Sequence, residues 1–100
     1  MAEIVLSKKA AIDLEDIWNY TFDNWSEKQA DIYYESLTES FQDIKRNPNI
    51  GKSYFSIFDD LKGYKISKHI IFYRILDKEL IRIERILHER MDLGDRITDT

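Results

Sequence analysis

The single proline, Pro48, separates two halves of the chain whose apolar residues follow different periods. Before it, apolar residues recur at intervals of three and four, which is the period of one face of an α-helix. After it, they alternate with polar residues or form short runs, as they do in β-strands. A residue that precedes proline is pushed out of helical conformation, so Asn47 is expected to end the helical half.

Two helices are predicted in the first half. Ser7 can cap the first, which follows the β-prone run "EIVL" and extends from residue 8 to about residue 25. Ser26 can cap the second, with Gln29 three residues later as in a capping box. No residue is left for a loop between Trp25 and Ser26, so an antiparallel helical hairpin is expected. The apolar stripes are Ala10, Leu14, Ile17, Trp18, Thr21 and Trp25, then Ala30, Tyr33, Tyr34, Leu37, Phe41 and Ile44.

Three strands are predicted in the second half, at residues 61–66, 69–76 and 80–87. The turns between them have two and three residues, which makes them antiparallel hairpins. The helical hairpin must cover one face of this sheet, which predicts an α+β two-layer sandwich in the order β-α-α-β-β-β. The N-terminal strand can join the sheet edge, and the other face is expected to stay open. Residues 1–100 are expected to form one domain, with the last few residues mobile.

The charge of the chain favours a protein partner over nucleic acid. Residues 1–50 carry five Lys or Arg and ten Asp or Glu, and residues 51–100 carry ten and nine. Nucleic-acid binders usually show a basic surplus or a dense basic stripe, because they neutralise phosphates. No direct nucleic-acid binding is therefore expected.

The sequence gives little support for a metalloprotein, a disulfide-rich protein or a membrane protein. The chain has no cysteine and two histidines, and Asp92 stands where a zincin motif beginning at His88 would need its second histidine. Neither a metal site nor a disulfide framework is expected. No apolar run approaches the ~20 residues of a membrane span, so we expect a cytoplasmic protein.

The segment "ILHERMD", residues 86–92, raises the question of catalysis. A histidine for proton transfer and guanidinium groups for a phosphate would suit RNA cleavage if His88 and Arg90 met Arg74 or Tyr73. In the alternative interpretation, which we favour, these residues form a solvated strand end in which Arg90 pairs with Asp92.

Strand alternation assigns these residues to faces of the sheet. Alternate residues of the last strand fall into two sets, one in the expected core and one on the open face. A β-bulge would exchange the two faces for all residues after the bulge. The core set is Ile81, Ile83, Arg85 and Leu87, and the open set is Arg82, Glu84, Ile86, His88 and Arg90. Trp18 and Trp25 are expected to pack, whereas Tyr20, Phe22, Ile32 and Tyr34 leave apolar surface for a partner.

The chain resembles ParE toxins, within the RelE/ParE superfamily of type II toxin–antitoxin systems. The resemblance is carried, in family order from about residue 7 to residue 92, by "DLEDIWNY", "QADIYYESL", "NPNIG", "GYK", "HIIFYRI" and "ILHERMD". Ser26 stands where many relatives have glycine, a departure that affects only the turn between the helices.

The resemblance implies a bacterial toxin that binds and poisons DNA gyrase without being an enzyme and without a cofactor. It implies a ParD-type antitoxin that wraps around the toxin in a hetero-oligomer and carries it to operator DNA. The alternative is a ribosome-dependent mRNA endoribonuclease of the RelE type, with Arg74, His88 and Arg90 as its catalytic residues. Ile70 stands near the position where that branch has its catalytic arginine, so this arginine is missing here. The candidates for contact with target or antitoxin are Tyr20, Tyr34, His69, Tyr73, Arg82, His88 and Arg90.

Overall fold

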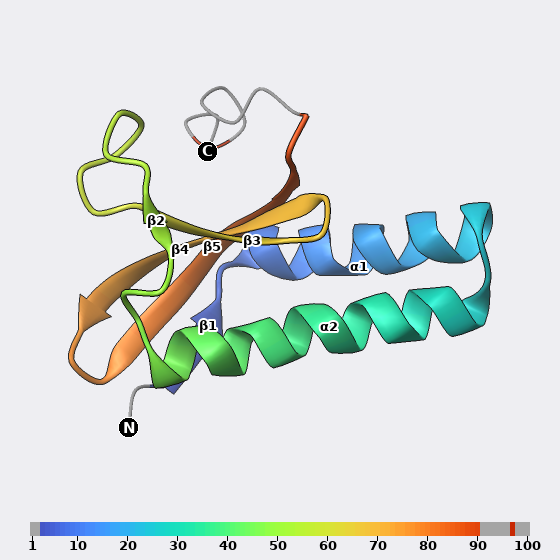
Figure 1. The fold of residues 1–100 in the computed structure, drawn as a ribbon, viewed down its shortest axis with the longest axis horizontal. Coiled ribbons are helices and arrows are strands. Elements are labelled where there is room, and N and C mark those ends of the chain that lie inside the picture. The colour runs from blue at the N-terminus through green and yellow to red at the C-terminus, as the bar shows by residue number, and fades with distance from the viewer. Residues whose placement is uncertain (1–2, 91–96, 98–100) are drawn as a thin grey trace.

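The computed structural model describes residues 3–90 and Ile97. Its elements are β1 (Glu3–Leu6), α1 (Lys8–Asn24), α2 (Glu27–Arg46), β2 (Lys52–Ser53), β3 (Lys62–Ile66), β4 (His69–Asp77) and β5 (Leu80–His88). The strands form one sheet in the order β1-β5-β4-β3-β2, and both helices lie on one side of it (Figure 1). The predicted α+β two-layer sandwich is confirmed.

The helical hairpin begins and turns where the local sequence indicates. The Ser7 hydroxyl accepts a hydrogen bond from the Ala10 backbone N–H at 3.0 Å, and the Ser26 hydroxyl accepts one from Gln29 at the same distance. Each bond satisfies a donor that the first turn of a helix leaves free. Only two residues separate α1 from α2, so the helices run antiparallel, and their joined end extends past the sheet (Figure 1).

The N-terminal strand joins the sheet edge, as expected, and its partner is the last strand. β1 runs parallel to β5, from Glu3 opposite Leu80 to Leu6 opposite Ile83, whereas the other neighbouring strands are antiparallel. The main core fills the space between the sheet and the helices. Its buried members are Ala10, Leu14, Leu37, Phe41, Ile44, Ile71, Tyr73, Ile81, Ile83 and Ile86.

The second face of the sheet is partly covered, which corrects the expectation that it stays open. The segment between β2 and β3 and the buried Ile97 form a second cluster on it. This cluster contains Leu61, Ile70, Phe72, Leu87 and Ile97, with Tyr54, Ile57 and Phe58 packed around it. Gly63 makes the close approach possible, because a Cβ there would lie 2.5 Å from Cε1 of Tyr54.

A register shift in β5 exchanges the faces of its last residues. Phe72 pairs with Arg85 but Tyr73 pairs with Ile83, so Glu84 is the extra residue of a β-bulge. Ile86 consequently lies in the main core and Leu87 in the second cluster. Strand alternation without a bulge had predicted the reverse for both residues.

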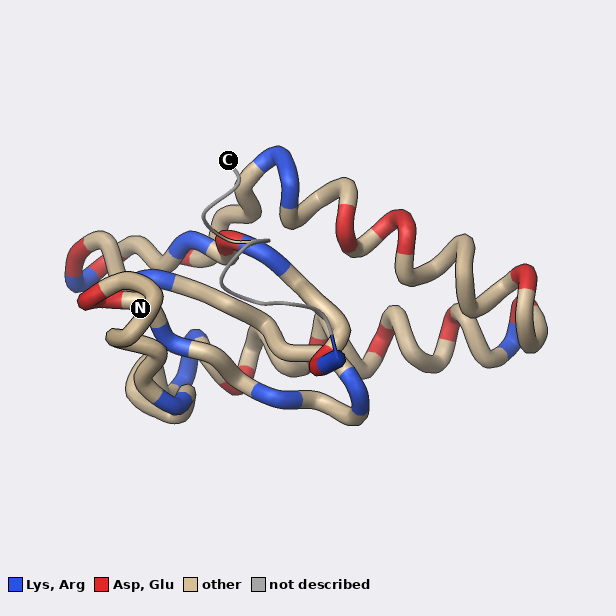
Figure 2. Tube along the Cα trace, turned by 90° about the horizontal axis from the view of Figure 1, so that it is seen from above, with Lys and Arg blue, Asp and Glu red and all other residues tan. Residues whose placement is uncertain are grey.

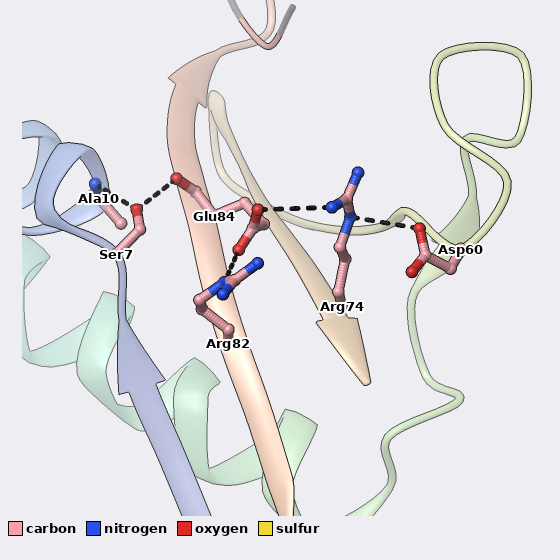
Figure 3. A network of polar contacts seen from close by, with 6 residues as sticks. All are labelled: Ser7, Ala10, Asp60, Arg74, Arg82 and Glu84. Atoms are coloured by element: carbon pink, nitrogen blue, oxygen red, sulfur yellow. Dashed lines mark hydrogen bonds and ion pairs between the residues drawn. The ribbon is translucent and has the colours of Figure 1, made fainter. Parts of the chain in front are cut away.

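Polar side chains tie this bulge to its surroundings (Figure 3). The Ser7 hydroxyl donates to the Glu84 carbonyl at 2.7 Å, while the Glu84 carboxylate lies between Arg82 and Arg74. Arg74 Nε also lies 3.2 Å from the Asp60 carboxylate. This ion pair lacks hydrogen-bond geometry, so Arg74 Nε has no hydrogen-bond acceptor among the described residues. The network connects the start of α1 to the middle of the sheet.

No described helix is long and apolar enough to cross a membrane. Within residues 3–90 and Ile97, no group of three or more candidate ligands comes together for a metal ion. The expected pair of Arg90 with Asp92 and the expected mobility of the last few residues involve positions outside the described residues.

Candidate functional site

A cleft of about 790 Å³ lies between the far end of the helical hairpin and the end of the sheet. Its residues come from both helices, the β3–β4 turn and the facing ends of β4 and β5. They are Asp16, Ile17, Tyr20, Thr21, Trp25, Gln29, Tyr33, Ser67, Lys68, His69 and His88. Because the joined end of the hairpin extends past the sheet, its last turns form a wall that faces no described strand (Figure 1).

The wall of the cleft is aromatic and exposed. Trp25 is 76% exposed and Tyr20 is 67% exposed, although both are large apolar side chains. The expectation that Trp25 packs in the helical stripe was wrong, because the apolar period continues beyond the edge of the sheet. Tyr20 does leave apolar surface, as expected. Exposed aromatic side chains that line a concave surface are typical of protein-binding sites.

The floor of the cleft is a row of three ring side chains. The Tyr33 hydroxyl and Nδ1 of His69 share a hydrogen bond of 2.6 Å. His69 lies opposite His88 in the β4–β5 pairing, and their ring centroids are 5.4 Å apart at 80°. Nδ1 of His88 accepts a hydrogen bond from the Arg90 backbone N–H at 3.1 Å. His88 therefore lies on the helix side of the sheet, not on the face where alternation had placed it, because of the bulge at Glu84.

Burial sets the ionisation of this floor. Desolvation, followed by repulsion from His88, lowers the pKa of His69 to about 4, although Asp13 and Glu89 act in the opposite direction. Desolvation also raises the pKa of Tyr33 above its ordinary value. At neutral pH the His69 and Tyr33 side chains are uncharged, so these two offer hydrogen bonds without a charge.

An unpaired strand edge lies beside the cleft. β2 pairs only with Lys62 and Gly63, so residues 64–66 have no further neighbouring strand in the described part of the chain. The turn that follows them, Ser67 and Lys68, lines the cleft. An added strand can bond such an edge through its backbone, while the apolar wall next to it takes side chains.

The remaining candidates from the sequence are scattered. Tyr73 is fully buried, and its hydroxyl donates to the Pro48 carbonyl at 2.7 Å and accepts from the Gly51 N–H at 3.0 Å. It holds the segment after α2 against the sheet and offers no surface to a partner. Tyr34 is 41% exposed and lies outside the cleft. Arg82 pairs with Glu84 near the middle of β5.

The structure does not bring Arg74 together with His88. The Arg74 guanidinium lies 4.7 Å from the ring of Phe58, on the face of the second cluster, whereas His88 faces the helices. Arg74 is also five residues from His69 along β4, or roughly 16 Å at ~3.3 Å per residue. A phosphate at the cleft floor would lie beyond the reach of Arg74.

Sequence reasoning missed several members of the cleft. Asp16 and Lys68 were not among the candidates because each looks like an ordinary surface position, and Thr21 and Gln29 were not because the first was assigned to the apolar stripe and the second to the helix cap. Residue counts gave no signal, because helices of 17 and 20 residues are about as long as strands of nine at ~1.5 Å per helical residue and ~3.3 Å per strand residue. Only the placement of the hairpin on the sheet leaves the end of its apolar stripe uncovered.

The sequence matches known proteins over most of its length. The family model described as "ParE toxin of type II toxin-antitoxin system, parDE" matches residues 4–93. Toxin ParE1 of Mycobacterium tuberculosis is 34% identical over 89 residues, which span 89% of this chain and 91% of that protein. Toxin ParE1 of Caulobacter vibrioides is 30% identical over 87 residues, which span 87% and 88%. Toxin ParE of Escherichia coli is 28% identical over 99 residues, which span 99% and 96%.

A solved structure shares the fold. It is a chain of the "Chromosomal ParDE TA system from P. aeruginosa", with a TM-score of 0.76 over 88% of this chain and 96% of that chain. The two sequences are 19% identical, so the likeness concerns the arrangement of the elements.

Proposed function

This chain belongs to the ParE toxin family of type II toxin–antitoxin systems, and we propose that it binds and poisons DNA gyrase until a ParD-type antitoxin neutralises it. The observation that carries the proposal is the match of the family model to residues 4–93. The toxin would act in the cytoplasm, by binding rather than by catalysis, and would reach operator DNA only through its antitoxin.

The cleft and the free edge of β3 together suit the antitoxin. A ParD-type C-terminal segment that wraps around the toxin needs backbone partners and apolar anchor points in one continuous path. Residues 64–66 offer the first, and Tyr20 and Trp25 offer the second. Backbone hydrogen bonds give such a complex affinity, and the pockets beside the edge give it specificity.

Ribosome-dependent RNA cleavage is the second function that the sequence suggests. It needs proton-transfer and cationic groups around one phosphate. The distance between Arg74 and His88, and the ion pairs that hold Arg74 to Asp60 and Glu84, give this function no support. Gyrase poisoning therefore remains the function that we propose.

Plasmid supercoiling by purified gyrase tests the proposal. The purified chain is added with and without the antitoxin, and the products are scored for lost supercoiling and for linear DNA. We expect linear DNA to rise with the chain and to disappear when the antitoxin is added first. If an active gyrase is unaffected by a chain that still arrests growth, the gyrase proposal is wrong, and translation of a defined mRNA on purified ribosomes is the next assay.

A further inference from the structure

A second concave surface lies on the helical hairpin, separate from the cleft. It is a groove of about 420 Å³ lined by Ala11, Leu14, Glu15, Trp18, Asp31 and Tyr34. None of these residues lines the cleft, and only Leu14 belongs to the main core that fills the sheet side of the hairpin. The other five residues lie outside the main core, so the groove between α1 and α2 opens away from the sheet.

Aromatic rings and carboxylates lie side by side in this groove. The indole N–H of Trp18 donates to the Asp31 carboxylate at 3.0 Å, which ties α1 to α2. The Trp18 ring stacks on Phe22 at 5.2 Å, so the aromatic surface continues along α1. The Glu15 carboxylate is exposed and makes no ion pair with a described residue. Rings beside uncompensated carboxylates attract a cationic side chain through both charge and the ring quadrupole.

The groove also lies in the most acidic part of the molecule. Residues 10–44 hold nine Asp or Glu against Lys28 alone, whereas residues 47–90 hold nine Lys or Arg against six Asp or Glu. Figure 2 shows the acidic positions spread along both helices and most of the basic ones on the strands and their turns. This separation gives the hairpin a negative field that steers it toward a basic surface.

We propose that this outer groove of the hairpin binds the toxin's protein target, by receiving a lysine or arginine side chain from a basic segment of that target. The inference rests on the proposed function, because it assumes a target protein that the toxin must bind. Charge complementarity decides the occupant: proteins that handle DNA carry surfaces rich in Lys and Arg that neutralise phosphates. The acidic hairpin presents such a surface with negative charge in place of DNA.

The position of the groove separates it from the antitoxin site proposed above. The antitoxin would lie in the cleft and along β3, on the sheet side of the hairpin, whereas the groove faces outward. Two binding events would then use opposite sides of the same two helices. Variants in the groove are accordingly expected to lose one partner and to keep the other.

Three variants of the full chain test the proposal. Glu15→Lys reverses the exposed charge in the groove, and Tyr34→Ala removes its exposed ring. Glu39→Lys is the matched control, because it makes the same change of net charge at an exposed position of α2 outside the groove. Each chain is expressed without antitoxin to score growth arrest, and each is purified to measure binding to gyrase subunits and to the antitoxin.

We expect Glu15→Lys and Tyr34→Ala each to weaken gyrase binding about tenfold or more and to relieve growth arrest. Antitoxin binding should change less than about threefold, which also shows that both chains fold. Glu39→Lys should behave like the unchanged protein. Gyrase binding by the unchanged chain should weaken as salt rises, because opposite charges are screened.

Several outcomes would overturn the proposal. Full growth arrest by both groove variants would do so, as would equal losses in Glu39→Lys, which would point to net charge alone. A loss of antitoxin binding would assign the groove to the antitoxin, and dimers of the unchanged chain that dissociate in Glu15→Lys would assign it to a second copy. If the unchanged chain ignores gyrase but arrests growth, gyrase is the wrong target, and relief of arrest by the groove variants still supports the groove.

Discussion

Asp13 of α1 and Arg85 of β5 form an ion pair with two contacts, of 2.7 Å to Nε and 2.9 Å to Nη2, and their side chains are 12% and 14% exposed. The same Asp13 carboxylate accepts a hydrogen bond from the Ile86 backbone N–H at 3.0 Å. β1 ends opposite Ile83, so Asp13 bonds β5 beyond the point where its neighbouring strand stops. A helix side chain thus completes the hydrogen bonding of a sheet edge.

Removing this carboxylate should destabilise the fold strongly. Asp13→Ala removes the carboxylate that accepts two hydrogen bonds from Arg85 and one from the Ile86 N–H, so we expect a loss of about 3–5 kcal/mol in the free energy of unfolding. Urea denaturation followed by circular dichroism measures it. Asp43→Ala, which breaks an exposed ion pair with Arg46, is the control and should cost less than about 1 kcal/mol. Equal losses in the two variants would contradict this account of Asp13.

A methyl group at Gly51 should displace a buried hydroxyl. A Cβ there would lie 2.6 Å from the Tyr73 hydroxyl, which is held by the Pro48 carbonyl and the Gly51 N–H. We expect Gly51→Ala to cost about 1–3 kcal/mol, because overpacking forces the ring or the backbone to move. Tyr73→Phe provides the comparison, since it removes both bonds without a clash and should cost about 1–2 kcal/mol. Thermal unfolding of both variants decides the matter, and a Gly51→Ala chain as stable as the unchanged one would refute the contact.

Acid should weaken the fold through His69. Its pKa is about 4 in the folded chain, below the ordinary value of 6.5, so between these pH values the unfolded chain binds a proton that the folded chain does not. The contribution to stability is complete above about pH 6.5 and is lost as the pH falls toward 4. The side chain is partly exposed, so the loss should stay below the ~1.4 kcal/mol per pKa unit of full burial.

A comparison of the unchanged chain with His69→Asn separates the contribution of His69 from that of the other titratable groups. His69→Asn keeps a hydrogen-bonding group near Tyr33 but does not titrate in this range. We expect its unfolding free energy to fall less than that of the unchanged chain between pH 6.5 and pH 5. Identical slopes in denaturation curves at these pH values would show that His69 does not control the response.

The exposed tryptophan at the end of α1 should matter for binding and not for stability. Trp25→Ala removes a side chain that is 76% exposed, so we expect unfolding to change by less than about 0.5 kcal/mol. Antitoxin affinity, measured by calorimetry, should fall about 10- to 100-fold if Trp25 is an anchor of the cleft. Phe55→Ala is the control, because Phe55 is 71% exposed and lies outside the cleft. A similar loss of affinity in both variants would argue against the cleft.

Local signals made most of the fold predictable. Ser7 and Ser26 mark helix starts through bonds within the next three residues, and Pro48 stops the second helix through its own ring. The turns after β3 and β4 are too short for anything but hairpins. Such features depend on neighbours in sequence, so they can be identified before any tertiary contact is known.

The site was less predictable, because it depends on contacts between distant residues. The bulge at Glu84 arises where the Ser7 hydroxyl and the Asp13 carboxylate bond β5, and neither contact leaves a pattern in the strand itself. The segment that covers the second face has no regular period to detect. Whether Trp25 packs or projects depends on how far α1 outruns the sheet, which residue spacing within the helix does not reveal.

The pairing of the first strand with the last has a consequence for how the toxin comes into being. Ser7 and Glu84, whose hydrogen bond adjoins that pairing, are 77 residues apart, so this part of the sheet has a high contact order. A ribosome that adds about 5–20 residues per second leaves β1 without its partner for roughly 4–15 s. The helical hairpin can form early from local contacts, but the cleft lacks His88 until β5 emerges. Each new molecule therefore completes its cleft only after β5 has been synthesised, well after the hairpin that forms the wall of the cleft.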